Sequence, residues 1–308
     1  MASLPGAVAH ATTRSPKKPL RWRDLLTPWL WVGLAMLFVI IFLIYPVLNT
    51  IWYSLFSFDS SSFVGLKNYF QIFTSPQLLL VLRNNVLWLI LATAGTVLLG
   101  LITAVLVDRV KIESAAKAAI FIPMAISFVG ASVIWLFMYA YAPKGTAQIG
   151  LLNAILARFG AGPVAWIQQT SINNFALMVI YIWMWTGFCM VILSAALKSV
   201  PSDVLEAARV DGASEVQVFF RIITPMISPT IAVVVTTMLI NVLKIFDIIY
   251  VMTGGNFNTN VVALAYYQEY FNFSENGIAD ALAVVLLIAV VPIMVVNLKR
   301  FRAQEAVR

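Results

Sequence analysis

The stretch that decides the fold is Glu206-Ala207-Ala208-Arg209-Val210-Asp211-Gly212, which is followed by Ile222 and then by Pro225. It lies between two long apolar segments of a chain that is otherwise dominated by apolar residues. The residue pattern predicts a polar helix, a glycine turn and a second short helix. Such an element is unusual between two apolar segments unless another molecule docks on it.

The composition around this stretch is that of a membrane protein. The chain has 308 residues, of which 61% are hydrophobic and 11% are charged. A soluble domain of this length cannot bury that much apolar surface, so the expected solvent is lipid. Six apolar segments reach the roughly 20 residues that cross a bilayer, and they are expected near residues 28–50, 84–107, 118–141, 172–197, 227–250 and 279–298. The fold class is therefore predicted to be an all-α membrane protein with six transmembrane helices.

Catalysis within the chain is not expected. The only histidine, His10, lies in a polar N-terminal stretch, and the only cysteine, Cys189, lies inside an apolar run. The sequence therefore offers neither a metal-ligand cluster nor a Cys–His couple, and it predicts no catalytic residues and no metal site.

The net charge of +7 is distributed in a way that predicts the topology. Cytoplasmic loops of membrane proteins carry an excess of Lys and Arg. One side would hold the basic residues Arg14, Lys17, Lys18, Arg21, Arg23, Arg109, Lys111, Lys117, Lys198, Arg209, Arg221, Lys299, Arg300, Arg302 and Arg308. The other side would hold only Lys67, Arg83, Lys144 and Arg158. Both termini and the loop 198–226 are therefore expected in the cytoplasm. The sequence contains no patch of basic and aromatic residues of the kind that binds nucleic acid, so no nucleic-acid partner is expected.

The loop 198–226 has the local signals of two short helices. Pro201 ends the fourth span, and Ser202 and Asp203 are good N-cap residues, with Glu206 three residues after Asp203. A helix over 203–211 would end at Gly212, which tolerates a positive φ.

A second helix is expected from Ser214 and Glu215 through Ile222. Thr224-Pro225 is expected to terminate it.

Two interpretations of this loop remain open from the residues alone. The small residues Ala207 and Ala208 allow another surface to approach closely, and Glu206, Arg209 and Asp211 can pair with its charges. Alternatively, the loop is an amphipathic element that rests on lipid headgroups.

The spacing of the loop resembles a known family. Glu206-Ala207-Ala208, Gly212, Ile222 and Pro225 stand at the spacing of the EAA loop of importer-type ABC permeases. The sequence departs from that pattern at Thr224, where the family usually has Leu. The loss of this apolar contact does not touch the glycine turn.

Further stretches are similar to the maltose-type first permease of carbohydrate importers, and together they cover about residues 25–300. They are Tyr45-Pro46, the run 63–69 (FVGLKNY) and the run 246–255 (FDIIYVMTGG). The runs 124–132 (MAISFVGAS) and 299–302 (KRFR) resemble those of α-glucoside permeases.

The resemblance implies a type I ABC importer permease in a bacterial plasma membrane. The loop would be a cytoplasmic coupling helix that docks on a dimer of ATPase subunits, which use ATP and Mg²⁺. The other implied partners are a second, homologous permease and an extracytoplasmic sugar-binding protein. The chain itself would need no cofactor and has no Walker A motif. The cargo would be an oligosaccharide such as trehalose, maltose or sucrose, and the sequence does not decide among them.

The predicted domains follow from the spans and the loop. Residues 1–24 and 301–308 are expected to be cytoplasmic tails, the first of them disordered. Residues 25–300 are expected to form the permease domain.

Polar residues inside the spans are candidates for the substrate pathway, because charges in lipid are costly and tend to be functional. Asn241 and Lys244 are expected on one face of span five, and Lys244 and Asp247 are also three residues apart. In span four, Tyr181 and Trp185 share a face at i, i+4 spacing, and aromatic rings suit the C–H faces of sugars. Alternatively, Lys244 and Asp247 form an ion pair that neutralises both charges, and Tyr181 and Trp185 are ordinary packing residues.

Other aromatic and acidic residues are assigned no chemistry. Tyr139 and Tyr141, like Trp29 and Trp31, are interpreted as membrane-interface anchors, and Gly95 and Gly100 as helix-packing positions. Glu269, Glu275 and Asp280 are interpreted as solvated loop charges.

Two other functional classes are weighed against the permease. A gradient-driven sugar or ion carrier would use Lys244 and Asp247 as its titrating pair, but the chain shows no internal inverted repeat. A membrane enzyme or assembly factor has still less support, because the spans contain no carboxylate cluster and no nucleophile–base set.

Overall fold

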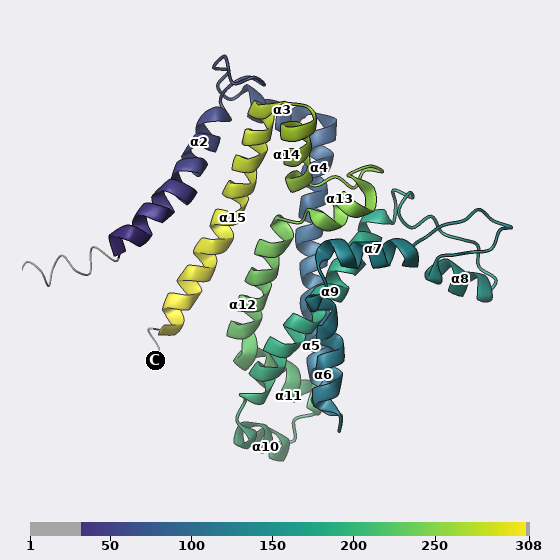
Figure 1. Ribbon diagram of the computed structural model, residues 1–308. Helices are drawn as coiled ribbons and strands as arrows, with labels where there is room; N and C mark the ends of the chain where they lie inside the picture. The colour runs from purple at the N-terminus through teal and green to yellow at the C-terminus, as the bar shows by residue number, and fades with distance from the viewer. Residues whose placement is uncertain (1–31, 306–308) are drawn as a thin grey trace, which may run out of the picture. The chain divides into compact units, whose positions relative to one another are not determined.

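The computed structural model of the chain describes residues 32–305. Contacts divide the chain into two units, residues 1–49 and 50–308, and each is described by itself. The predictions for the tail 1–24, for Trp29 and Trp31 and for residues 306–308 lie outside the described residues. The described residues are helical apart from their connecting loops (Figure 1).

The helices in chain order, with π- and 3₁₀-segments written η, are η1 (Ile40–Ile44), α2 (Tyr45–Tyr53), α3 (Lys67–Thr74), α4 (Pro76–Leu87), η2 (Trp88–Ala92), α5 (Thr93–Val107), α6 (Glu113–Phe121), η3 (Ile122–Ala125), α7 (Phe128–Met138), α8 (Leu151–Arg158), α9 (Asn173–Lys198), α10 (Ser202–Val210), α11 (Glu215–Val218), η4 (Phe219–Ile223), α12 (Thr224–Leu243), α13 (Asp247–Thr253), α14 (Val262–Tyr267), η5 (Gln268–Asn272) and α15 (Asn276–Glu305).

Five of the predicted spans appear as long apolar helices among residues 32–305. They are Val32–Tyr53, Pro76–Val107, Asn173–Lys198, Glu215–Leu243 and Asn276–Val295. The helix Val32–Tyr53 contains all the described residues of the first unit, which are residues 32–49. The prediction of an all-α membrane protein is confirmed, and the number of spans is six if the bent helix pair described next counts as one.

The third predicted span, 118–141, is not one straight helix. The segments Glu113–Ala125 and Phe128–Met138 meet at an angle of 100°. Pro123 lies in the 3₁₀ turn η3, and Ser127 starts α7 by accepting a hydrogen bond from the Gly130 backbone N–H at 3.1 Å. The proline ends one helix, and the capping serine begins the next. Hydropathy alone predicts one continuous span over the same residues.

The fifth span also differs from the prediction of 227–250. The helix ends at Leu243, and α13 begins at Asp247 after the non-helical residues Lys244, Ile245 and Phe246. The backbone of Phe246 has φ −140° and ψ −61°, which interrupts the helix. Lys244 and Asp247 therefore do not lie on one continuous helix, although the sequence predicted a single span through both.

The core of the second unit is the packing of α5 against α9 (Figure 1). A Cβ atom on Gly100 would lie 2.4 Å from Cys189 Cβ, and one on Gly95 would lie 2.7 Å from Ile182 Cδ1. Both glycines thus allow the close helix approach that the sequence predicted.

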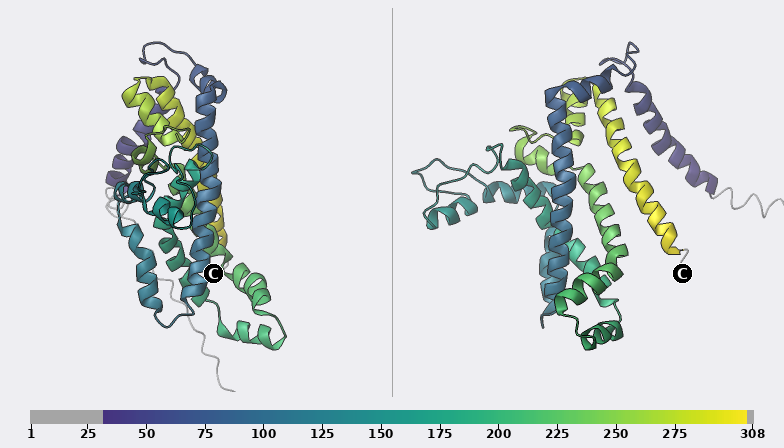
Figure 2. Two further views of the ribbon diagram at one scale, coloured as in Figure 1. Left: turned by 90° about the vertical axis from the view of Figure 1, so that its right-hand side faces the viewer. Right: turned by 180° about the vertical axis from the view of Figure 1, so that it is seen from behind.

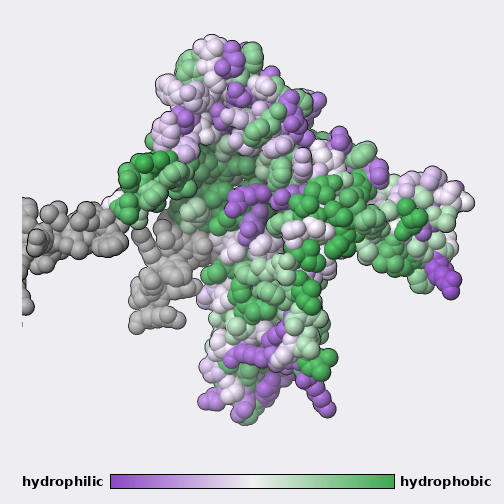
Figure 3. Space-filling model, in the orientation of Figure 1, coloured by the Kyte–Doolittle hydropathy of each residue, from purple (hydrophilic) through white to green (hydrophobic). Residues whose placement is uncertain are grey.

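The two ends of the second unit carry different loops. Figures 1 and 2 show α10 and α11 at one end, and α3, α14 and the start of α4 at the opposite end. Figure 3 shows hydrophilic residues gathered at both ends and, between them, mostly hydrophobic residues with one hydrophilic patch. Apolar side chains such as Leu98, Leu106 and Phe137 are more than half exposed, as expected for surfaces that meet lipid or another membrane chain.

Candidate functional site

The first half of the loop 198–226 is the helix α10, which begins directly after Pro201. Pro201 occupies the N-cap, and no side chain caps the helix, so the capping role expected of Ser202 and Asp203 is not seen. Glu206 and Ala207 are exposed and Ala208 is half-buried. The helix thus presents its short side chains and its carboxylate at the surface.

The turn after α10 depends on Gly212. This glycine has φ +83°, and its N–H donates to Arg209 O at 3.0 Å. The N–H of Ala213 donates to Ala208 O, also at 3.0 Å. This pair of bonds is a Schellman motif, in which a residue with positive φ satisfies the last carbonyls of the helix.

The second half of the loop does not end where the sequence predicted. Ser214 and Gln217 form a capping box at the start of α11. The helix then runs without interruption from Glu215 to Leu243, through Ile222 and Pro225. Thr224-Pro225 fails to terminate it because the π-turn η4 precedes Pro225, and the Thr224 hydroxyl donates to Phe219 O at 2.9 Å. The loop is therefore continuous with the fifth span.

An ion pair inside the loop joins its two halves. Arg209 Nε lies 2.8 Å from Glu215 Oε1, and Arg209 Nη2 lies 3.4 Å from Glu215 Oε2. Both side chains are about half exposed. Among the described residues, Glu206 and Asp211 form no ion pair and are exposed. These two carboxylates, rather than Arg209, are the charges left available to another surface.

A polar network that the sequence did not predict lies at the same end of the second unit. Lys117 Nζ lies 2.9 Å from Asp108 and 2.6 Å from Glu113, and it also bonds to the Ser194 hydroxyl. Ser194 in turn donates to Asp108 at 2.7 Å, and Lys198 pairs with Glu113. The only sequence signal was the i, i+4 spacing of Glu113 and Lys117. The network joins α6, the end of α9 and the loop after α5.

The aromatic pathway candidates of α9 lie in the core of the chain. The rings of Tyr181 and Trp185 stack with centroids 6.1 Å apart, which confirms that they share a face. Tyr181 is fully buried, and its hydroxyl is 4.0 Å from Met238 Sδ. Trp185 is half-buried and also contacts Phe128 and Phe188. Of the two rings, Trp185 is thus the one with exposed surface.

Tyr139 is another aromatic residue that is placed differently from the prediction. It is 3% exposed, and its hydroxyl donates to Ala176 O at 2.9 Å. Tyr139 is therefore a packed core residue and not an interface anchor, whereas Tyr141 is exposed. The bend before α7 turns this end of the segment against α9.

The polar candidates of span five cluster at the break that ends α12. Asn241 is half-buried and donates to Thr237 O at 2.9 Å, Lys244 is exposed, and Asp247 is half-buried at the first position of α13. No ion pair joins Lys244 to Asp247 within residues 32–305. The Lys244–Asp247 ion pair that the sequence suggested is therefore not formed among the described residues.

Comparison with known proteins places the chain in a family. Residues 96–304 match the model of the binding-protein-dependent transport system inner membrane component. The osmoprotective compounds uptake permease protein GgtC of Synechocystis is 56% identical over 279 residues, which cover 91% of this chain and 100% of that protein. The alpha-glucoside transport system permease protein AglF of Rhizobium meliloti is 47% identical over 281 residues, covering 91% and 84%.

Solved structures show the same fold. The crystal structure of a bacterial ABC transporter for import of the polysaccharide alginate contains a chain that superimposes with a TM-score of 0.77 at 23% identity, covering 91% of this chain and 98% of that one. The family consists of transport components, so the prediction that the chain is not an enzyme is confirmed. Nothing in these relatives supports the gradient-driven carrier. The chain therefore belongs to the family of binding-protein-dependent transport system inner membrane components, as a multi-pass permease subunit of the ABC importer type.

Proposed function

We propose that the chain is the permease subunit of an ATP-driven importer whose cargo is an oligosaccharide of the α-glucoside class. The relative AglF is named for alpha-glucoside transport, and a trehalose/maltose permease of Thermococcus litoralis is 31% identical over 293 residues. Two relatives with related cargoes favour a glucoside such as trehalose, maltose or sucrose.

The observation that carries the proposal is the exposed turn at Gly212, which joins α10 to a helix that continues into the fifth span. An ATPase subunit that binds α10 can move the fifth span, because a helix without a break transmits displacement along its axis. Glu206, Ala207 and Ala208 form the contact surface, and Asp211 supplies a second charge.

The orientation and the partners complete the proposal. The loop 198–226 and both termini lie in the cytoplasm of a bacterial cell, as the basic residues favour. A dimer of ATPase subunits binds ATP and Mg²⁺, while this chain binds no cofactor. A second, homologous permease shares the pathway, and an extracytoplasmic binding protein delivers the sugar.

Within the membrane, the proposed pathway runs past the break between α12 and α13. Trp185, Asn241 and Lys244 offer a ring face, a carboxamide and an ammonium group, all of which suit a sugar. Tyr181 supports Trp185 by stacking on it. Asp247 borders the same break.

The test is ATP hydrolysis by the purified whole complex, with and without sugar-loaded binding protein. Proline at position 212 cannot adopt the observed φ of +83° and lacks the N–H that donates to Arg209 O. We expect Gly212→Pro to leave an assembled complex whose hydrolysis no longer responds to the loaded binding protein. Undiminished stimulation in the variant, or sugar transport by the chain without an ATPase, would overturn the proposal.

The class of cargo is tested by competition. Uptake of radiolabelled maltose into proteoliposomes that contain the whole complex is expected to be inhibited by other α-glucosides. A β-linked disaccharide of the same size, such as cellobiose, serves as the matched control. Equal inhibition by the two classes would contradict the α-glucoside assignment.

A further inference from the structure

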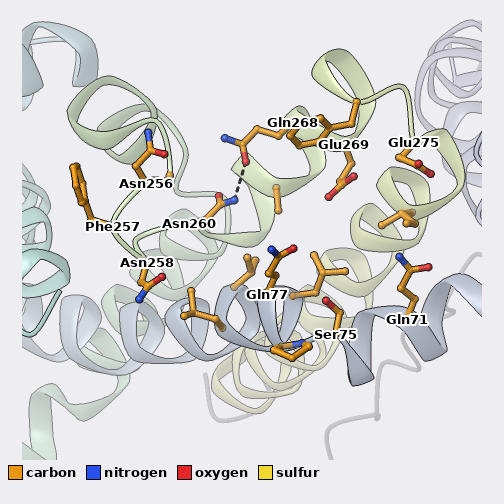
Figure 4. Close-up of a pocket in the computed structure, with 18 residues that line it drawn as sticks. Gln71, Ser75, Gln77, Asn256, Phe257, Asn258, Asn260, Gln268, Glu269 and Glu275 are labelled. Carbon is orange, nitrogen blue, oxygen red and sulfur yellow. Dashed lines mark hydrogen bonds between the residues drawn. The ribbon is translucent and has the colours of Figure 1, made fainter. Parts of the chain in front are cut away.

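We propose that a pocket at the end of the second unit opposite α10 binds a neutral carbohydrate before it enters the pathway; this rests on the proposed function. The pocket has a volume of about 670 Å³, within the range of small-molecule sites. It is enclosed by α3, α4, the loop after α13, η5 and the start of α15 (Figure 4). The polar residues that line it include Gln71, Gln77, Asn256, Asn258, Glu269 and Glu275.

One wall of the pocket is a strained loop. Phe257 and Asn258 have φ of 56° and 62°; this left-handed conformation is rare for a bulky residue such as Phe257, whereas asparagine adopts it more readily. Asn84 Nδ2 donates to Asn258 O at 2.8 Å and to Asn260 O at 2.9 Å, and Asn173 Nδ2 donates to Phe257 O at 2.7 Å. Strain that is held in place by buried side chains is characteristic of ligand-binding sites.

The polar groups of the pocket fall into two sets. Asn260 Nδ2 donates to Gln268 Oε1 at 2.8 Å, and Gln268 Nε2 donates to Gly254 O at 2.9 Å, so these amides brace the wall. In contrast, no hydrogen bond within the described residues involves the side chains of Gln77, Glu269 or Glu275. Figure 4 shows Gln77 and Glu269 projecting into the space between α4 and η5.

The chemistry of the lining selects the class of ligand. Carboxamides both donate and accept hydrogen bonds, and carboxylates accept them from hydroxyl groups. The lining has two carboxylates and no Lys or Arg, which disfavours an anion. Phe257 and Phe273 are 45% and 63% exposed beside the pocket and offer ring faces to C–H groups. A neutral molecule with many hydroxyl groups satisfies all of these features.

From the sequence alone, Glu269 and Glu275 are expected to be solvated loop charges. The structure places both in the pocket, where burial and the neighbouring Glu275 raise the pKa of Glu269. A hydroxyl-bearing ligand would donate hydrogen bonds to these oxygens without bringing a further negative charge.

The test is photoaffinity labelling of the whole complex with a diazirine derivative of maltose, in the absence of binding protein and ATP. We expect adducts in the peptides around 71–81 and 254–278. Gln77→Ala and Glu269→Ala are each expected to lower this labelling about tenfold, the loss typical of a hydrogen bond to a charged group or of a well-placed amide. Gln168→Ala, an exposed glutamine outside the pocket, is the matched control and is expected to label normally.

Labelling that is confined to other segments, or that is unchanged in both pocket variants, would overturn the proposal. If the pocket variants label normally but weaken stimulation by the binding protein, the pocket receives a protein segment and the proposal is also wrong. Either failure leaves the importer function intact as long as Gly212→Pro abolishes stimulated hydrolysis. Loss of the importer function would instead appear as hydrolysis that never responds to the loaded binding protein.

Discussion

Replacing Gly212 with alanine isolates the contribution of one backbone dihedral to coupling. Gly212 has φ +83°, and no heavy atom lies within 4 Å of the position that a Cβ would take. Alanine therefore meets no clash, and its whole penalty is the left-handed conformation, about 1–2 kcal/mol. This penalty lowers the ratio of the intact turn to its opened form by about 5- to 30-fold.

Two assays measure that shift. The amide hydrogens of residues 212 and 213 donate to Arg209 O and Ala208 O, so their exchange with deuterium reports on opening of the turn. We expect exchange at both amides to accelerate by about the same 5- to 30-fold. ATP hydrolysis stimulated by the loaded binding protein is expected to fall in parallel. Gly212→Asn should lose less in both assays, because asparagine tolerates the left-handed region.

Gly160→Ala is the matched control. Gly160 has φ +75°, and the position that its Cβ would take also has no heavy atom within 4 Å, so the backbone penalty is the same. It lies in the loop after α8, away from α10, and stimulated hydrolysis is expected to be unchanged. The Gly212 turn is not the coupling element if Gly160→Ala uncouples as strongly as Gly212→Ala, or if exchange accelerates at residue 213 while stimulation is unaffected.

Three further changes test the packing and the charges of the chain. Gly100→Ala forces a Cβ to within 2.4 Å of Cys189 Cβ and is expected to destabilise the protein by about 1–3 kcal/mol, measured by thermal unfolding in detergent; an unchanged midpoint would contradict the close α5–α9 contact. Lys117→Met removes the cation that Asp108 and Glu113 share in a half-buried network. It should destabilise the protein by about 1–3 kcal/mol in the same assay, whereas the loss of a fully exposed ion pair would not have so large an effect. Glu275→Gln removes a negative charge and should lower the raised pKa of Glu269, so that its carboxyl deprotonates at lower pH in an infrared titration; an unmoved or higher midpoint would refute the interaction.

The membrane class and most spans could be predicted because hydropathy reports directly on the solvent of a helix. The span predicted at 172–197 is found at Asn173–Lys198. The break at Lys244 and the bend at Ser127 were missed for a different reason. Each depends on a few residues whose backbone is set by capping and tertiary packing, and a window of about 20 apolar residues averages over them.

The coupling loop was predictable where its signals are local. Gly212 was expected to take a positive φ, and it does so in a Schellman motif. The end of the second helix was not predictable from Pro225, because a proline in the first turn after a π-segment can be accommodated. The pocket could not be predicted from the sequence, because Gln77 and Glu269 are far apart in the chain and only folding brings them together.

The two sides of the loop are attached to the membrane helices in different ways, and this difference bears on how motion at α10 is transmitted. On the α9 side, Pro201 interrupts the helix, and the end of α9 is tied to its neighbours through Lys117 and Ser194. On the other side, one helix runs from Glu215 to Leu243. A displacement of α10 therefore moves α12 more readily than α9. The movement would emerge at the break after Leu243, beside Lys244 and Asn241, where the helix ends.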